Sequence, residues 1–189
     1  DTTAAFGVMN QLWAYVQMPA VAVGSAVSAM AAQNIGAGRW DRINRIALSG
    51  VAINVAMTAV LIGAITLFGR PILQLFLAAN SGAIPIAIHI SHMVSWTFIL
   101  MGISMVLTFL VRANGAVIAP LVILIIAGVV VRFSIGFGLH PHYGAEAIWW
   151  AFIATSLSSF AMTTAYYAHG SWRRMSVMGG RPGAQAGGP

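Results

Sequence analysis

The sequence predicts an all-α fold, a polytopic membrane helix bundle with about five transmembrane helices. First, 59% of the 189 residues are hydrophobic and only 6% are charged, whereas a soluble domain carries about 25% charged residues. Second, nine arginines and three acidic residues, with no lysine, are too few to cover a surface in water. Third, the charges are separated by long neutral windows, and a helix of about 20 apolar residues crosses a bilayer. The strands of a membrane barrel, about 10 residues long with alternating polarity, do not match this pattern.

The neutral windows place the five helices along the chain. We expect them at residues 6–33, 43–68, 85–111, 116–137 and 145–168. Asn80, Gly82 and Pro85 interrupt a window that is too long for one span, so residues 71–77 are expected to form a short interfacial helix before the third span. Residues 1–175 then make up the membrane domain. The segment 176–189 is rich in glycine and is expected to be a disordered cytoplasmic tail.

The arginines predict how the bundle is oriented. If the five spans cross the membrane in turn, two arginines lie on one side, Arg70 and Arg132. The other side holds seven arginines: Arg39, Arg42, Arg45, Arg112, Arg173, Arg174 and Arg181. By the positive-inside rule, the side with seven faces the cytoplasm, so we expect a multi-pass protein of the inner or plasma membrane with a cytoplasmic C-terminus. Residue 1 would then lie outside. Because no cleavable signal precedes it, we expect the chain to be a fragment of a larger membrane protein.

The most distinctive motif follows the first expected span. It consists of Gln33, Asn34, Gly36, Gly38 and Arg39. Physically it is a helix end and a turn, in which Gly36 or Gly38 can take the left-handed conformation of a C-cap and Asp41 can begin the next helix. A generic cytoplasmic turn rich in arginine is the alternative interpretation.

Four later segments accompany this turn in a fixed order. They are residues 68–76, the Arg-x-x-Gly turn with a following proline at 110–120, the arginine at 131–133, and the glycine-containing entry to the last span at 143–149. Together with the turn they resemble the multidrug and toxic compound extrusion (MATE) family of transporters. The resemblance covers about residues 5 to 175. It implies that the five spans correspond to helices eight to twelve of a twelve-helix transporter, with helix seven and the N-terminal half absent.

Several side chains are candidates for a substrate cavity. Asn10, Trp13 and Gln17 follow the spacing i, i+3, i+7 and share one helix face, which is expected to look into the bundle or a wet cavity because an amide is costly against hydrocarbon. Trp96 and Met101, with Met105 and Phe109 further along, supply the soft and aromatic surface that suits lipophilic cations. Interhelical hydrogen bonding and ordinary packing are the alternatives. Pro19 is expected to kink the first span, as a hinge or as a packing feature.

Charged and titratable side chains are rare inside the expected spans. Arg132, late in the fourth span, and Glu146, early in the fifth, are expected to form a structural ion pair near the outer interface; the alternative is that Arg132 extends to the interface alone. His89 and His92 lie at i, i+3 without a third ligand nearby, so no metal site is expected. His140 and His142, on either side of a proline, are expected in an external loop.

The resemblance implies a secondary active antiporter that exports organic, often cationic, compounds in exchange for H⁺ or Na⁺. In this family the coupling carboxylates lie in the first helix and, in sodium-coupled members, also in helices seven and ten. The third span here, which would be helix ten, has none. We therefore expect coupling carboxylates in the missing half, and a proton as the coupling ion is favoured.

Other functions are weighed by the chemistry that they need. A membrane enzyme needs converging acidic, histidine or hydroxyl groups, and a chain with three acids predicts neither an enzyme nor a cofactor. Scattered arginines do not make the basic face of a nucleic-acid binder. A lipid-linked oligosaccharide flippase of the same superfamily would need several basic residues in its cavity. It remains an alternative, as does a non-transporting membrane scaffold subunit. The expected partners are the lipid bilayer, the missing N-terminal half and a small organic substrate.

Overall fold

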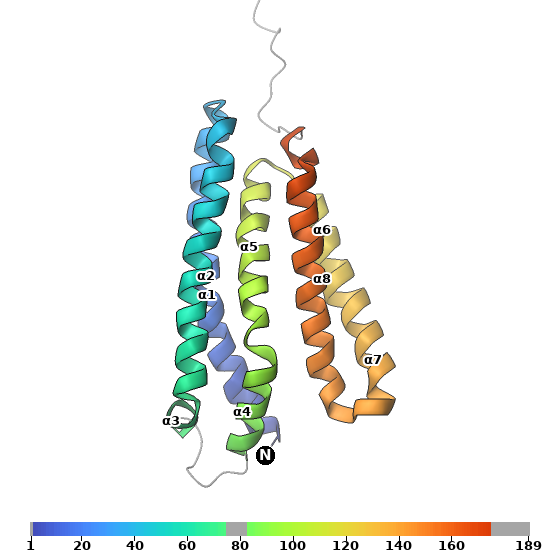
Figure 1. Cartoon of the computed structure of the whole chain (residues 1–189). Coiled ribbons are helices and arrows are strands. Elements are labelled where there is room, and N and C mark those ends of the chain that lie inside the picture. The colour runs from blue at the N-terminus through green and yellow to red at the C-terminus, as the bar shows by residue number, and fades with distance from the viewer. Residues whose placement is uncertain (1, 75–82, 175–189) are drawn as a thin grey trace, which may run out of the picture.

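The computed structural model describes residues 2–74 and 83–174, and within them the chain is helical and has no strand. The long helices lie side by side in one bundle (Figure 1). In chain order they are α1 (Thr2–Gly36), α2 (Ile43–Leu67), α3 (Gly69–Gln74), α4 (Ala83–Val94), α5 (Thr97–Ala113), α6 (Ile118–Ile125), α7 (Arg132–Tyr143) and α8 (Ala147–His169). The all-α class is confirmed. The tail expected at 176–189 and the second half of the interfacial helix lie outside the described residues, whereas α3 forms where that helix begins.

The described helices have the length and composition of membrane spans. Three are long and apolar enough to cross a bilayer, at Gly7–Gly36, Trp40–Leu67 and Ile118–Tyr143, and the bent pair Ile84–Val94 and Thr97–Ala113 passes the same test as a unit. α8 is long enough but less apolar, since six of its 23 residues are serine or threonine, and it does not reach the same hydropathy. Several long apolar helices are therefore present, while five spans and their numbering in a transporter stay predictions.

The outer surface of the bundle is apolar. Leu48 is 71% exposed, Ile118 70% and Phe137 75%. A soluble monomer rarely exposes large contiguous apolar patches, whereas hydrocarbon solvates these side chains.

The third predicted span is not one straight helix. α4 ends at Val94, α5 begins at Thr97, and the two are bent by 51°. At the break, the Thr97 hydroxyl donates to the carbonyl of Val94 (2.7 Å) and the Trp96 indole donates to the carbonyl of Met93 (2.9 Å). Side chains that bond nearby carbonyls offer the backbone an alternative to the helical ladder. The prediction of an unbroken helix over 85–111 was wrong because apolar periodicity does not register this competition.

The fourth predicted span is longer than expected. α6 continues through a π-helical segment (Ile126–Val131) into α7, which ends only at Tyr143, where Gly144 takes a φ of 55°. His140 and His142 therefore lie in the last turns of α7, and the external loop predicted for them was wrong. Pro141 removes one backbone hydrogen bond near the end of the helix without ending it.

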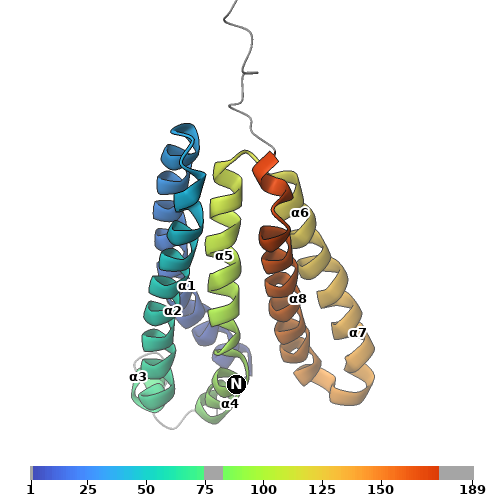
Figure 2. The ribbon, with the colours of Figure 1, turned by 45° about the horizontal axis from the view of Figure 1, so that its top comes forward.

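The helices pack around α5. In both views α5 lies between α1 and α2 on one side and α6 and α8 on the other (Figures 1 and 2). Glycines let the helices approach closely. A Cβ on Gly50 would collide with Val27 of α1, and a Cβ on Gly102 of α5 would collide with the buried amide of Asn54 of α2. Small residues at such contacts are typical of helix packing in membranes.

The ends of α1, α5 and α8 meet at one end of the bundle (Figure 1). There the short helical turn after α8 (Ser171–Arg174) folds back and buries Trp172 completely. The Trp172 ring stacks on the Tyr167 ring, and its centroid lies 6.2 Å from that of the Trp40 ring. The backbone carbonyl of Trp172 accepts a 2.7 Å hydrogen bond from the side chain of Asn114. Trp172 thus joins the α1–α2 turn, the α5–α6 turn and the end of α8. Six of the seven arginines predicted on one side flank these helix ends.

We expect Trp172→Ala to destabilise the protein strongly. Removing a buried tryptophan costs about 3–5 kcal/mol, and here it also loosens three helix ends. The melting temperature in detergent should fall well below that of the parent protein. Trp150→Ala is the matched control, since Trp150 is 43% exposed and should change the melting temperature little. Equal shifts for the two variants would contradict the role given to Trp172.

We also expect Gly102→Ala to destabilise the packing of α2 on α5 by about 1–3 kcal/mol, the usual cost of overpacking. Gly63→Ala has open space around the new methyl group and should stabilise its helix by about 1 kcal/mol. Adding Asn54→Ala to Gly102→Ala should recover most of the lost stability, because the colliding amide is then gone. Additive losses in this double-mutant cycle, measured by thermal unfolding, would show that the two residues do not interact.

Candidate substrate cavity

A cavity of about 430 Å³ lies between α1, α5, α6 and α8. Along α5 its lining extends from Phe98 to Arg112, which corresponds to roughly 21 Å of helix. Drug-sized ligands are bound in cavities of about 300–1,000 Å³ that are mostly apolar with a few polar groups. The volume and length of this cavity therefore fit a small organic molecule.

The lining is soft and aromatic, with a few polar groups, of which Arg112 is charged. Its soft and aromatic members are Phe98, Met101, Met105 and Phe109, and its polar members are Gln17, Ser104, Thr108, Arg112, Ser159 and Thr163. Methionine repacks around differently shaped ligands, and aromatic faces attract cations. The cavity is therefore chemically suited to varied lipophilic cations, held by contact area more than by fixed charge.

The structure brings two of the five predicted cavity residues together. Gln17 of α1 and Met101 of α5 both line the cavity. Asn10 shares a face with Gln17 but is exposed and lies two helical turns away, about 10.5 Å along the axis. Trp96 is 45% exposed at the break between α4 and α5, with its indole bonded to the Met93 carbonyl. Neither Asn10 nor Trp96 belongs to the lining.

Trp13 lies beneath the cavity and supports it. Its ring is 5% exposed and contacts three aromatic rings, with centroid distances of 5.6 Å to Phe98, 6.0 Å to Trp149 and 5.9 Å to Phe152. Since Phe98 is itself a lining residue, Trp13 fixes the position of one wall. Its indole nitrogen is buried without a hydrogen-bond partner. α1 runs unbroken past Pro19, and a hinge at that residue stays a prediction.

The predicted ion pair does not form. The carboxylate of Glu146 lies 3.7 Å from Nε2 of His89, and the Arg132 guanidinium lies over the Phe152 ring, 5.6 Å from its centroid. The physical reason is the length of α7, because its twelve residues place Arg132 roughly 16 Å along the axis from Tyr143, after which Glu146 follows. The His89–Glu146 contact joins α4 to the start of α8, and both side chains are more than half exposed.

The predicted turn motif is a well-formed helix end. Gly38 has a φ of 70°, while Gly36 is the last residue of α1. The backbone N–H of Arg39 donates to the carbonyl of Asn34 (2.8 Å) and that of Gly38 donates to the carbonyl of Ile35 (3.0 Å). These two bonds are the Schellman pattern, so Gly38 is the C-cap glycine. The backbone carbonyl of Gln33 accepts a hydrogen bond from the N–H of Ala37. The side-chain amide of Asn34 donates one to the carbonyl of Met30, one turn earlier.

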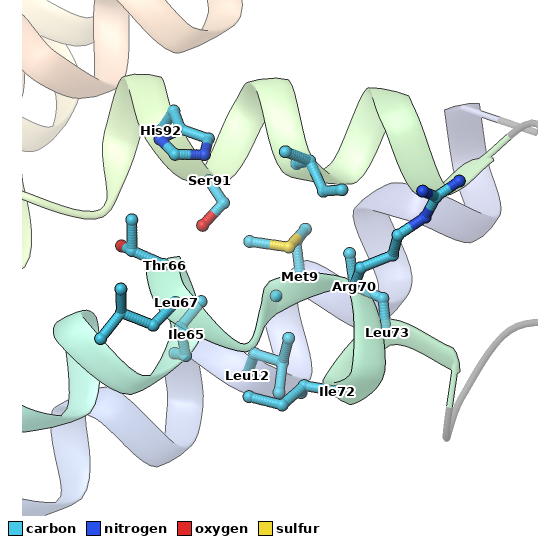
Figure 3. Close-up of a pocket in the computed structure, with 12 residues that line it drawn as sticks. Met9, Leu12, Ile65, Thr66, Leu67, Arg70, Ile72, Leu73, Ser91 and His92 are labelled. Atoms are coloured by element: carbon cyan, nitrogen blue, oxygen red, sulfur yellow. The ribbon is translucent and has the colours of Figure 1, made fainter.

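A second cavity, of about 180 Å³, lies between α1, α4 and the α2–α3 corner at the opposite end of the bundle. Figure 3 shows His92 and Arg70 at opposite ends of it, with Met9 between them. The Ser91 hydroxyl is bonded to Ser95 within the chain. This cavity is too small for a drug-sized ligand. Among residues 2–74 and 83–174, no three histidine, aspartate or glutamate side chains converge on a metal position.

The polar side of the cavity was not predicted. Ser104, Thr108 and Arg112 follow Met101 at helical spacing on α5, and the sequence pattern alone could have shown this stripe. Ser159 and Thr163 on α8 carried no such signal. Their share in the cavity depends on which face of α8 turns toward α5, and only the packing sets that face.

Comparisons with known proteins agree with the earlier resemblance. The MatE family model matches residues 1–137. The chain is 35% identical over 179 residues, 94% of its length, to the probable multidrug resistance protein YoeA of Bacillus subtilis (strain 168). It is 29% identical over 91% of its length to the probable multidrug resistance protein YpnP of the same organism. The chain spans 38% of the length of each of these relatives. No solved structure matches it. The chain belongs to the MATE family, and its several long apolar helices are those of a multi-pass membrane protein.

Proposed function

We propose that this chain is the C-terminal portion of a secondary active antiporter, which exports organic, often cationic, compounds in exchange for H⁺ or Na⁺. The observation that carries the proposal is the cavity of about 430 Å³ lined by methionine and aromatic side chains. Its lining contains no carboxylate, so it favours bulky lipophilic substrates bound by contact area over small ions. Family membership and the printed names of the two relatives support the same function.

The coupling site is proposed to lie outside this chain, in the N-terminal half. Of its three acids, Asp41 and Glu146 are exposed near helix ends and Asp1 lies outside the described residues. A membrane-embedded carboxylate is the usual carrier of a coupling proton or sodium ion. With no such group in the cavity lining, the substrate and the coupling ion would be bound by different parts of the transporter. A proton is the favoured coupling ion, no cofactor is proposed, and no enzymatic activity is proposed.

The flippase alternative is less well supported by the cavity. A pyrophosphate-linked substrate needs several basic side chains, and Arg112 is the one basic residue in the lining. Arg112 belongs to the arginine-rich end of the bundle, which is proposed to face the cytoplasm of the inner or plasma membrane. A scaffold subunit would need no cavity of this volume.

Transport by the full-length protein tests the role of the cavity. We expect Gln17→Leu to reduce efflux of ethidium from cells about fivefold to tenfold. This factor corresponds to the free energy of roughly one hydrogen bond between protein and substrate. Asn10→Leu is the matched control on the same helix face outside the lining, and its efflux should stay within about twofold of the parent. Expression and thermal stability are measured for both. Equal losses from both variants, or none from Gln17→Leu, would argue against this cavity as the substrate site.

Cysteine labelling tests the orientation. The chain contains no cysteine, so each single substitution adds the one reactive thiol within these 189 residues. We expect Ala37→Cys, in the turn after α1, to react with a membrane-impermeant maleimide only in inside-out vesicles. His142→Cys, at the end of α7, should react only in right-side-out vesicles. The reverse pattern would invert the proposed topology, and labelling of both from one side would exclude the odd number of membrane spans proposed between them.

A further inference from the structure

A second apolar groove runs along the outside of the bundle, separate from the substrate cavity. It has a volume of about 480 Å³. Leu48 and Val51 of α2 form one wall, Phe160 of α8 forms the other, and Ile103 and Leu107 of α5 form the floor. Its lining residues come from α2, α5 and α8, and Figure 1 shows α2 and α8 on either side of α5. Along α8 the lining from Phe160 to Ala168 covers roughly 12 Å.

One end of this groove is polar and basic. Asn44, Tyr167 and Arg173 line it there. The Tyr167 hydroxyl and Nη2 of Arg173 both donate to Oδ1 of Asn44, at 2.9 and 2.8 Å. The guanidinium also lies 5.3 Å from the centre of the Trp172 ring. These contacts hold Arg173 at the mouth of the groove. A guanidinium has five N–H donors, so Arg173 has donors beyond the one that bonds Asn44.

The surroundings of the groove match a lipid in shape and in charge. Leu48 is 71% exposed, so this face of α2 looks outward. The arginine-rich end adds Arg45, which is exposed and next to Asn44 in sequence. A basic site between helices at the proposed cytoplasmic side is typical of anionic lipid recognition. Deeper in the groove, the Thr164 hydroxyl is buried without a hydrogen-bond partner.

We propose that this groove binds an anionic glycerophospholipid, with an acyl chain along Leu48, Val51 and Leu107 and the phosphate on Arg173. A free phosphate would use the basic end and leave the apolar groove empty. An additional helix about 10 Å wide and 12 Å long needs roughly 900 Å³, about twice the volume available. The assignment rests on membership of a membrane transporter family and is independent of the substrate cavity.

Lipid retention by the purified full-length protein tests this site. Native mass spectrometry would follow phosphatidylglycerol carried from nanodiscs. We expect Arg173→Gln to reduce retention about fivefold, the effect of one arginine near an anionic surface. Arg174→Gln, the neighbouring control outside the lining, should retain lipid within about twofold of the parent, and Arg173→Lys should be intermediate. Full retention by Arg173→Gln, or equal losses from Arg173→Gln and Arg174→Gln, would overturn the proposal.

A second measurement locates the lipid and does not depend on the stability of the Arg173 variant. In the cysteine-free chain, phosphatidylglycerol with a photoreactive acyl chain should label peptides containing 44–51 or 103–107. Phosphatidylcholine with the same chain should label them at least about fivefold less. Equal labelling by the two lipids would overturn the proposal. So would loss of labelling in millimolar inorganic phosphate, which would assign the basic end to free phosphate. A disulfide between two copies of Leu48→Cys would assign the groove to a second copy of the chain.

Discussion

Hydrogen bonding in a medium without water is the constraint on which the rest of this structure depends. In hydrocarbon every backbone group must find its partner within the protein, and a helix supplies those partners locally. Several hydroxyl side chains are paired locally in the same way, whereas those of Thr58 and Thr164 are buried without a partner. Ser104, Thr155 and Ser156 each donate to the carbonyl four residues earlier. α8 can therefore carry six serines and threonines and still pack among apolar helices. The same local bonding, at Thr97 and Trp96, is what breaks the third span.

Because lipid tails are as apolar as leucine, helix association depends on close contact. Two kinds of contact hold this bundle. Gly50 and Gly102 let α2 approach α1 and α5, and aromatic clusters around Trp13 and Trp172 fill the two ends of the interfaces. Trp13 supports a wall of the substrate cavity, and Trp172 fixes the arginine-rich end. The packing thus places both candidate binding sites on a frame with few charges.

The helical segments were predictable from the sequence, because rare charges divide the chain into apolar windows. Their breaks were not, since the bend before Thr97 depends on hydroxyl and indole bonds to carbonyls, and the extension of α7 to Tyr143 depends on Gly144. That extension also explains the wrong ion pair, which assumed that Arg132 lay close to the end of its helix. In the cavity, Gln17 and Met101 were predictable from helical spacing. The sequence could not show that Gln17 lines the cavity and Asn10 does not, because periodicity gives the face of a helix on which a residue lies and not its position along the helix.

α5 and α8 contribute to both candidate sites from opposite sides. On α5 the substrate cavity takes Met101 and Met105, whereas the lipid groove takes Ile103 and Leu107. On α8, Thr163 lines the cavity and its neighbour Thr164 lines the groove. On α5 the residues of the two sites are two positions apart and point about 200° apart, and on α8 they are neighbours that point about 100° apart, so the two sites share walls rather than atoms. Interiors packed to high density respond to strain by moving whole elements. A shift of α5 against α8 would therefore change the volumes of both sites together, and occupancy of one site would alter the affinity of the other only through that movement.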